Sequence, residues 1–332
     1  MFNQSKLPIL SKYYLYSLDR IYILNFVLLP LSVLYFFINI FRKLFLSNKK
    51  RNIIPVVVVG NLTVGGTGKT SLVIWLCNHL ESRKYKIGVI SGGYKTNNPN
   101  ELQVVGDRSQ IKEVGDEAIL IKKNTQSIVC KCKNRKKAYE YLVSTFDLDV
   151  IISDDGLSHY NLSRDLDIVI VKENKPFGNG LLLPAGPLRE TPSAIYKYEN
   201  ILVNKNKKSN LLGFCYDLAS VIDINKSEEI DIYDFSGTTM HLVTAIANPD
   251  LLIKYLKRLN IDLITHIYPD HYILEKNDFL FEDDYKVIMT EKDFVKCSSY
   301  NLNNAYYLPT KIIVDNDIKI MLNNKISELL KV

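Results

Sequence analysis

Residues 65–70 read GGTGKT, a set of residue types that can bind phosphate. Glycines let backbone N–H groups turn toward an anion, and the N-terminus of a following helix adds a partial positive charge. Lys69 can reach the β- and γ-phosphates of a nucleoside triphosphate, and the hydroxyl of Thr70 can ligate Mg²⁺. The usual pattern has glycine five residues before Gly68, where this chain has Thr63. We predict a nucleotide site formed by Thr63, Gly65, Gly66, Thr67, Gly68, Lys69 and Thr70.

A pair of carboxylates, Asp154 and Asp155, follows the short apolar stretch 150–153. In phosphate-loop proteins, a carboxylate at the end of such a strand holds Mg²⁺ directly or through water. Two acids before a glycine are also common in solvated turns, but the upstream loop favours metal binding for at least one of them. His159 lies four residues beyond Asp155 and could contact the nucleotide or its phosphates.

A second group of residues could act on a hydroxyl group. Asp116 and Glu117 stand at the start of a predicted helix, a position equally compatible with helix capping. Asp270 and His271 lie in a loop after a predicted strand. A carboxylate and an imidazole that meet in space can act as base and orienter for a hydroxyl. The sequence alone does not show whether Asp116 and His271 meet.

The segment 177–190 is rich in glycine and proline and ends in Arg189 and Glu190. Its simplest interpretation is a structural connection. Arg189, together with Arg135, could grip a phosphate with its planar guanidinium, although most arginines are solvated surface residues.

The predicted elements place these residues at one edge of a sheet. Residues 55–59 read PVVVV, an apolar run typical of a buried parallel strand, and a helical pattern follows the glycine loop. The alternation of strands and helices predicts an α/β fold with a doubly wound, mostly parallel sheet, which binds ligands outside the carboxyl ends of its strands. We predict strands at 87–91, 102–105, 127–132, 150–153, 166–171 and 201–203, a helical stretch at 118–124 that residues 114–117 open, and a helix at 134–146.

The chain has 332 residues, which is long enough for two ordinary domains. The polar, basic segment 204–210 is the predicted boundary between them. We expect an N-terminal helix region at 1–50, a phosphate-loop core domain at 51–205, and a smaller α/β domain at 206–332 that closes over the site. Within this last domain we predict strands at 241–245, 263–267 and 285–290 and helices at 249–259 and 318–330.

Residues 21–41 contain no charged side chain, and a helix of this length is about 31 Å long, which is about the thickness of a bilayer core. A basic cluster over residues 42–51 suits an anionic cytoplasmic leaflet. Because no small-residue cleavage site closes the run, a signal peptide is disfavoured. The helix could span the membrane, lie in one leaflet, or be buried in a soluble fold. Four residues interrupt its apolar character: Asn25, Pro30, Ser32 and Asn39.

Composition limits the other classes of function. The net charge is +6 and the basic residues are spread along the chain, so nucleic acid is not an expected partner. Hydrophobic residues make up 47% of the chain, which excludes general disorder. The five cysteines are scattered and odd in number, which argues against a disulfide framework.

Taken together, these motifs resemble the tetraacyldisaccharide 4'-kinase family, the lipid A 4'-kinases of Gram-negative bacteria. The family's loop also lacks the first glycine, so Thr63 fits its pattern. The matching stretches follow the family's order along nearly the whole chain: VVGNLTVGGTGKT (58–70), SGGY (91–94), GDEA (115–118), SDDGLSH (153–159), RDLDIVIV (164–171), GNGLLLPAGPLRE (178–190), ANPD (247–250), PDHY (269–272) and TEKDFVKC (290–297).

The resemblance implies a membrane-associated kinase at the cytoplasmic face of the inner membrane. Such an enzyme transfers the γ-phosphoryl of ATP to the 4'-hydroxyl of a tetraacylated disaccharide 1-phosphate, forming lipid IVA, with Mg²⁺ as cofactor. We expect it to act as a monomer.

The resemblance also assigns roles by position. Asp116 falls on the catalytic base and His271 on its partner. Asp154, Asp155 and Glu190 fall on metal- and nucleotide-site acids. Further positions that line the site, on the nucleotide side or on the substrate side, are matched by Tyr94, Glu117, Arg135, His159 and Arg189.

The chain departs from the family pattern at four positions. The family usually has arginine where Gly92 stands, proline where Ala118 stands, and phenylalanine-glutamine where Leu157 and Ser158 stand. Gly92 removes a charge near the substrate side, and Ser158 shortens a possible nucleotide contact. Since the acids, Lys69 and the imidazole are present, we expect an active enzyme.

Two other classes of function fit part of the sequence. A membrane-bound NTPase switch of the partitioning type would carry a lysine where Val64 stands, and this chain lacks it. An ATP-dependent synthetase that acts on a soluble acid would leave the apolar helix of residues 21–41 unexplained.

Overall fold

The computed structural model describes residues 22–46 and 51–330. These residues divide into two compact units. The core unit contains residues 22–46, 51–215 and 312–330, and the inserted unit contains residues 216–311. The chain therefore leaves the core unit after residue 215 and returns to it at residue 312.

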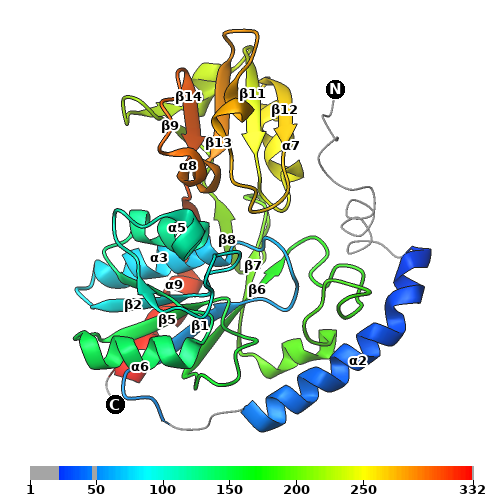
Figure 1. The fold of residues 1–332 in the computed structure, drawn as a ribbon, viewed down its shortest axis with the longest axis vertical. Coiled ribbons are helices and arrows are strands. Elements are labelled where there is room, and N and C mark those ends of the chain that lie inside the picture. Colours follow the sequence, from blue (N-terminus) through cyan, green and yellow to red (C-terminus); the bar gives the residue numbers. More distant parts are fainter. Residues whose placement is uncertain (1–21, 47–50, 331–332) are drawn as a thin grey trace. The chain divides into compact units, whose positions relative to one another are not determined.

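The core unit is built on one sheet with the strand order β15-β8-β7-β6-β1-β5-β2-β4-β3 (Figure 1). From β8 to β4 the neighbouring strands are parallel, and β3 is antiparallel to β4. The strands are β1 (Val56–Gly60), β2 (Ile87–Ser91), β3 (Gln103–Val104), β4 (Ile128–Lys131), β5 (Val150–Asp154), β6 (Leu166–Lys172), β7 (Asn200–Asn204), β8 (Gly213–Tyr216) and β15 (Ile312–Val314).

Every residue of β1, β2 and β5 is buried, so both faces of the sheet are covered at its centre. Helix α3 contacts β1, β5 and β2, and α6 contacts β2 and β4. This arrangement confirms the predicted doubly wound α/β fold. The helices of the core unit are α2 (Ile23–Leu46), α3 (Lys69–Glu81), α4 (Ile111–Val114), α5 (Asp116–Asn124), α6 (Arg135–Thr145), the 3₁₀ helix η1 (Pro192–Lys197) and α9 (Asn316–Leu330).

The last helix packs on the core unit rather than on the inserted unit, into which the sequence had placed it. The amide oxygen of Asn323 lies 2.8 Å from Nε2 of His79 in α3, from which it accepts a hydrogen bond, and Lys325 pairs with Glu199. Three side chains of α9 at helical spacing are buried: Ile318, Leu322 and Ile326. The predicted boundary near residue 205 also differs from the observed one, because β8 still pairs with β7.

The inserted unit has its own sheet, with the strand order β10-β9-β14-β13-β11-β12. Its four strands from β14 to β12 are parallel, while β9 pairs antiparallel with β14 and β10. The elements are β9 (Ser220–Asp223), β10 (Glu229–Asp231), η2 (Ile232–Phe235), β11 (Thr239–Thr244), α7 (Asp250–Arg258), β12 (Asp262–Ile267), η3 (Lys276–Phe279), β13 (Lys286–Thr290), α8 (Glu291–Cys297) and β14 (Ala305–Leu308).

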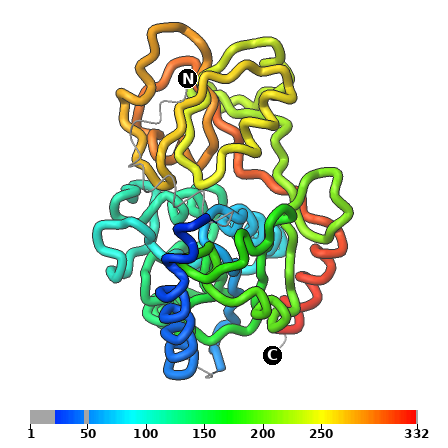
Figure 2. The backbone as a smooth tube through the Cα atoms, turned by 90° about the vertical axis from the view of Figure 1, so that its right-hand side faces the viewer, coloured from blue at the N-terminus to red at the C-terminus, as the bar shows by residue number. Residues whose placement is uncertain are grey.

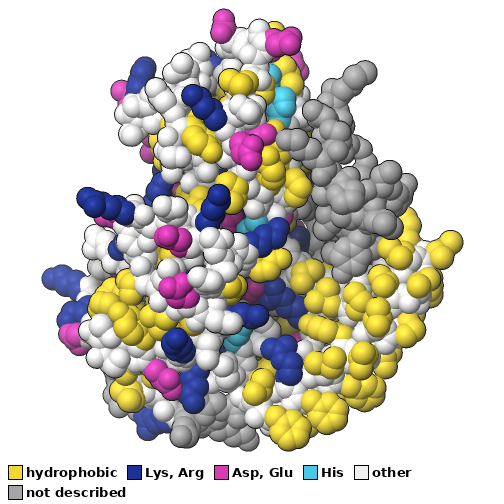
Figure 3. Space-filling model, viewed as in Figure 1, with side chains coloured by type: hydrophobic (Ala, Val, Ile, Leu, Met, Phe, Trp, Pro, Cys, Tyr) yellow, Lys and Arg dark blue, Asp and Glu magenta, His cyan; other side chains and the backbone are white. Residues whose placement is uncertain are grey.

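Helix α2 lies on the outside of the core unit, beside the segment that leads into η1 (Figures 1 and 2). Hydrophobic side chains cover its outward side (Figure 3). Ile23, Val27, Leu44 and Phe45 are among its most exposed residues, and their side chains are 69–85% exposed. The buried residues of this helix are the polar Asn25 and Ser32. Its burial pattern is thus the reverse of that of a soluble amphipathic helix.

A polar chain inside the inserted unit links two histidines to an acid. His241 on β11 lies 2.9 Å from His266 of β12 and 2.8 Å from the carboxylate of Asp283, and its ring stacks on Phe281. Burial, and then the neighbouring His241, lower the pKa of His266. The unfolded chain therefore binds more protons than the folded chain below about pH 6.5, the ordinary histidine pKa.

We expect the inserted unit to lose stability as the pH falls below 6.5, because His266 resists protonation only in the folded state. The protection factors of the amides of residues 239–267, which are exchange rates corrected for the intrinsic rate at each pH, should be lower at pH 5.5 than at pH 7.5. His266→Gln should remove most of this difference. Equal pH dependence in both proteins would show that another group controls it.

Candidate active site

The loop of residues 61–68 joins β1 to α3 and has the geometry that the sequence predicts for phosphate binding. Gly65 and Gly68 have φ angles of 102° and 90°, which favour glycine. Gly68 caps α3, and a Cβ atom there would lie 3.1 Å from Asn204 Nδ2 and from the ring of Phe214. Gly68 has no side chain that could cap the first turn of α3, so the N-terminus of this helix can interact with an anion.

Two neighbours hold the side chain of Lys69. Its ammonium donates a 3.1 Å hydrogen bond to Asn61 Oδ1 and lies 3.8 Å from Asp155 Oδ1. Asn61 in turn donates to the carbonyl and the hydroxyl of Thr63, at 2.6 and 3.2 Å. Thr63, which stands where the usual pattern has glycine, therefore helps to position Lys69 through Asn61. Thr63 also forms a β-bridge with Leu188.

Asp154 ends β5, the strand directly beside β1. Its Oδ2 accepts a 3.2 Å hydrogen bond from the Thr70 hydroxyl, the pair expected to bind Mg²⁺. Burial, and then the negative charge of Glu117, raise the pKa of Asp154 to about 7. A buried carboxylate with a raised pKa is ionised at neutral pH only when a cation lies beside it.

Asp155 adopts a left-handed backbone conformation, with φ of 51°, which is unusual for a residue other than glycine. Its carboxylate forms a bidentate pair with Arg189 Nη1 and Nη2, at 2.6 and 2.9 Å. Burial opposes its ionisation, but Lys69 and Arg189 hold the pKa of Asp155 well below its usual range. Asp155 is therefore a carboxylate that organises two cations at the phosphate loop.

The guanidinium of Arg135 is 2% exposed and donates from Nη2 to the Asp154 carbonyl at 2.6 Å. Its Nε and Nη1 have no hydrogen-bond partner within the described residues, as expected for a group that awaits an anion. A Cβ atom on Gly92 would lie 2.9 Å from Nη2, so this departure from the family pattern leaves room for Arg135. Burial, and then Arg135, lower the pKa of His159 to about 3 and keep that imidazole neutral.

The residues present fit a Mg²⁺–nucleotide complex. Asp154 Oδ1 and Thr67 Oγ1 are buried and have no hydrogen-bond partner among the described residues. No set of three His, Cys, Asp or Glu side chains in the described chain could enclose a metal ion. Mg²⁺ needs no such set here, since it is commonly held by one or two carboxylates, a hydroxyl, water and the phosphates.

Three other predicted site residues make contacts outside the phosphate loop. Glu190 accepts a 3.1 Å hydrogen bond from Tyr160, whereas its neighbour Arg189 contacts Asp155. Tyr94 is 63% exposed, with the Lys95 ammonium 5.9 Å from its ring centroid. Asp116 is buried at the start of α5 and accepts from the Glu117 amide at 2.9 Å.

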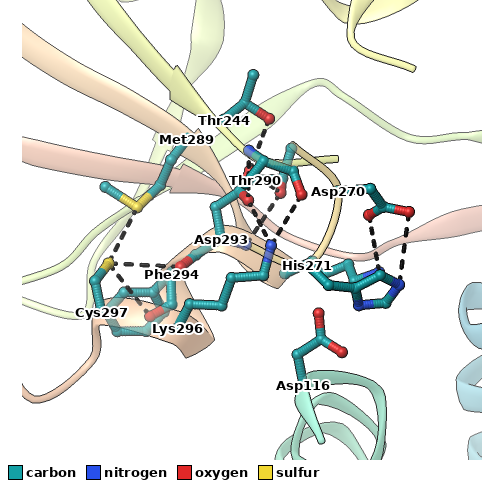
Figure 4. Close-up of polar contacts among 12 residues, drawn as sticks. Asp116, Thr244, Asp270, His271, Met289, Thr290, Asp293, Phe294, Lys296 and Cys297 are labelled. Carbon is teal, nitrogen blue, oxygen red and sulfur yellow. Dashed lines mark hydrogen bonds and ion pairs between the residues drawn. The ribbon is translucent and has the colours of Figure 1, made fainter. Parts of the chain in front are cut away.

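His271, the predicted partner of Asp116, belongs with its neighbour Asp270 to the inserted unit. His271 has φ of 62°, and its Nε2 lies 3.5 Å from Asp270 Oδ2 (Figure 4). Lys292 of α8 lies 3.8 Å from Asp270 Oδ1. The next residue, Asp293, is fully buried and accepts hydrogen bonds from Thr244, Thr290, Ala245 and Lys296, which anchors the start of α8.

The structure shows the contacts of two further departures from the family pattern, Leu157 and Ser158, and does not explain a third, Ala118. Leu157 covers Gly60, where an added Cβ would lie 2.5 Å from its Cγ. The carbonyl of Ser158 accepts a 3.5 Å hydrogen bond from Arg42 of α2. Ala118 is fully buried in α5, and nothing in the structure explains the replacement of proline.

Sequence reasoning missed Asn61 and Asn204 as site residues. Asn61 positions Lys69, and Asn204 at the end of β7 donates a 3.0 Å hydrogen bond to the Thr67 carbonyl. Asn61 directly follows Gly60, the last residue of β1, and this position at the start of the loop could have indicated a role in the site. Asn204 stands 134 residues after Thr70, and only the pairing of β7 with β6 brings it to the loop.

A glycine loop between a strand and a helix, with a lysine, a threonine and a neighbouring strand that ends in two acids, defines a P-loop nucleotide-binding α/β protein. The family description Tetraacyldisaccharide-1-P 4'-kinase matches residues 24–327. The chain belongs to this family.

Relatives named tetraacyldisaccharide 4'-kinase support the assignment. The chain is 35% identical over 308 residues to one from Ruthia magnifica subsp. Calyptogena magnifica, covering 92% of this chain and 98% of that protein. It is 38% identical over 295 residues to one from Hahella chejuensis, covering 86% and 87%. The structure is similar to LpxK from Aquifex aeolicus, crystallised in complex with ATP, with a TM-score of 0.74, 28% identity and coverage of 93% of this chain and all of that one.

Proposed function

We propose that this protein transfers the γ-phosphoryl group of ATP to the 4'-hydroxyl of tetraacyldisaccharide 1-phosphate, forming lipid IVA in lipid A biosynthesis. Membership of the family supports the reaction. The observation that carries it is the phosphate loop with Lys69 supported by Asn61 and Asp155, beside the Thr70–Asp154 pair. These groups can hold a triphosphate and stabilise the charge that develops as its terminal phosphoryl leaves.

Each site residue has a role in this proposal. The loop amides, Lys69 and Arg135 bind the phosphates, and neutral His159 contacts the nucleotide. Mg²⁺, when bound, would be held by Thr70 and Asp154 with Asp155 nearby, and would offset charge on the phosphates. For Glu190, which bonds to Tyr160, a role at the metal is proposed from the family resemblance alone.

The hydroxyl side of the site rests on family resemblance. Asp116 is proposed as the base that accepts the proton of the sugar hydroxyl, and His271 as its partner. Tyr94, Glu117 and Arg189 are proposed to line the substrate side. The inserted unit is proposed to act as the smaller domain of the kinase, and the protein as a monomer.

We propose that α2 lies in the cytoplasmic leaflet of the inner membrane rather than spanning it. The helix is long and apolar enough to cross a membrane, and only 11% of its most apolar window is buried. Three contacts from Asn25 to Asn39 attach it to the core unit over about 21 Å of helix, so one side is occupied by protein along that length. Its outward apolar side is then free for lipid.

An apolar groove of about 440 Å³ lies between α2 and the segment before η1. Leu29, Val33, Phe36 and Phe37 line it on the helix side, and residues 180–182 line it on the other. We propose that an acyl chain of the substrate rests here while its sugar reaches the phosphate loop, which would explain why this kinase keeps its helix at the leaflet.

The membrane role predicts a specific effect of charge on the outward side of α2. Val27→Asp combined with Leu44→Asp should reduce recovery with anionic vesicles by about tenfold or more, because both side chains are about 70% exposed and a buried charge is costly in lipid. Tyr233→Asp, at a residue of the inserted unit that is 63% exposed, is the matched control. Unchanged sedimentation of the double variant with vesicles would contradict the proposal.

The reaction is tested by incubating the protein with γ-labelled ATP, Mg²⁺ and tetraacyldisaccharide 1-phosphate in detergent micelles. Label should move into the lipid, and omission of Mg²⁺ should abolish the transfer. ATP hydrolysis without labelled lipid would favour an NTPase switch and overturn the proposed function.

A further inference from the structure

Three polar residues of α2 form a row along one side of this otherwise apolar helix. Asn25, Ser32 and Asn39 are spaced seven residues apart, and seven residues of an α-helix turn 20° less than two full turns. The three side chains therefore share one side of the helix. Asn25 is fully buried, Ser32 is 4% exposed and Asn39 is half-buried, while the apolar residues between them are mostly exposed.

Each residue of this polar row bonds to the backbone of segment 182–189. Asn25 Nδ2 donates to the Ala185 carbonyl at 2.6 Å. The Ser32 hydroxyl donates to the Leu182 carbonyl at 2.9 Å and accepts from the Ala185 amide at 3.0 Å. Asn39 Nδ2 donates to the carbonyl of Arg189 at 2.9 Å. The helix is thus attached by directional bonds to one segment rather than by apolar packing alone.

The same segment is attached on its other side to the phosphate loop. The Arg189 amide donates to the Leu62 carbonyl at 2.7 Å, and the Val64 amide donates to the Pro187 carbonyl at 2.8 Å. Residues 62 and 64 flank Thr63, at the start of the predicted nucleotide loop. Segment 182–189 therefore connects α2 to this loop through hydrogen bonds at both sides.

Arg189 is held at three points. Asn39 binds its carbonyl, Leu62 binds its amide, and Asp155 binds both ends of its guanidinium. Asp155 in turn lies 3.8 Å from the Lys69 ammonium. A displacement of the Arg189 backbone would therefore move a guanidinium that helps to place the acid beside Lys69.

We propose that Asn39 is a positioning residue for phosphoryl transfer, which acts through Arg189 and makes the geometry at Asp155 depend on the docking of α2. This inference rests on the proposed roles of Arg189 and Asp155. Its consequence is that the membrane helix has two separable sides. The outward side serves lipid binding, and the polar row serves the alignment of the active site.

The test compares variants of the full-length protein on micellar substrate and on vesicles. Asn39→Asp preserves the size of the side chain but removes the donor, and Asn39→Leu removes its polarity. Both should lower kcat about tenfold with little change in the KM for ATP and with normal recovery on vesicles. Asn39→Gln, which retains a donor, should keep more activity than either. The matched control, Leu34→Asn on the outward side, should weaken vesicle recovery and leave kcat unchanged on micelles.

A double-mutant cycle separates positioning from general destabilisation. If Asn39 acts through Arg189, Asn39→Leu should lower kcat far less in an Arg189→Ala background than in the parent protein. Full additivity of the two changes would overturn the inference, as would wild-type kcat in Asn39→Leu and Asn39→Asp. Wild-type activity of Arg189→Ala itself would instead reject the proposed role of Arg189.

Discussion

Replacement of Asp116 by asparagine is expected to lower kcat by about 10³-fold, the range that a positioned general base contributes. The variant keeps an oxygen that can accept the 2.9 Å hydrogen bond from the Glu117 amide, so the start of α5 should stay intact. It loses the basicity that would take the proton of the sugar hydroxyl. Single-turnover kinetics with labelled ATP measure the loss directly.

Binding of a fluorescent ATP analogue should change little in Asp116→Asn, because the nucleotide loop belongs to a different segment. Asp107→Asn, an exposed carboxylate, is the control for a general effect of charge. A kcat within a few-fold of the parent would remove Asp116 from the role of base. In that case His271→Ala would show whether the inserted unit supplies the base.

Lys69→Ala is expected to lower kcat/KM by about 10³-fold, because one preorganised cation at the transferring phosphoryl group is worth 10²–10³ or more. Its ammonium is fixed by Asn61 and lies near Asp155, so little reorganisation is needed when charge develops. Lys69→Arg should not restore activity, since a planar guanidinium does not fit the place of a compact ammonium that is 12% exposed.

The control for Lys69 is Lys136→Ala, which removes an exposed lysine that pairs with Glu140 on α6. Isothermal titration with ATP and steady-state kinetics separate the loss of binding from the loss of turnover. An active Lys69→Ala protein would indicate that Arg135 and Arg189 supply the necessary charge.

The parts of the fold that depend on local pattern could be predicted from the sequence. The predicted strand at 87–91 coincides with β2, and those at 150–153 and 166–171 differ from β5 and β6 by one residue. A continuous apolar run bounded by glycine or acids specifies a central parallel strand almost by itself. The glycine loop could equally be predicted from the sequence, because its residues are consecutive.

What the sequence did not reveal depends on pairing between distant segments. The short strands β8, β9, β10, β14 and β15 carry little pattern of their own and exist because a neighbouring strand binds them. The bidentate contact of Arg189 with Asp155 spans 34 residues, and the contact of Asn204 with Thr67 spans 137. The seven-residue spacing of the polar row of α2 can be read from the sequence. The sequence does not show that these residues bond to segment 182–189, and their role depends on that contact.

The return of the chain to the core unit at residue 312 has a consequence for how the protein is made. Synthesis delivers β15 and α9 only after the whole of the inserted unit, so the nucleotide-binding sheet lacks its edge strand β15 until residues 312–314 have been made. Lys205, whose side chain is 9% exposed, also meets its partner Asp315 only then. Residues 312–330 therefore complete the core unit, and a chain cut short near residue 311 would lack a part of that unit rather than a dispensable segment.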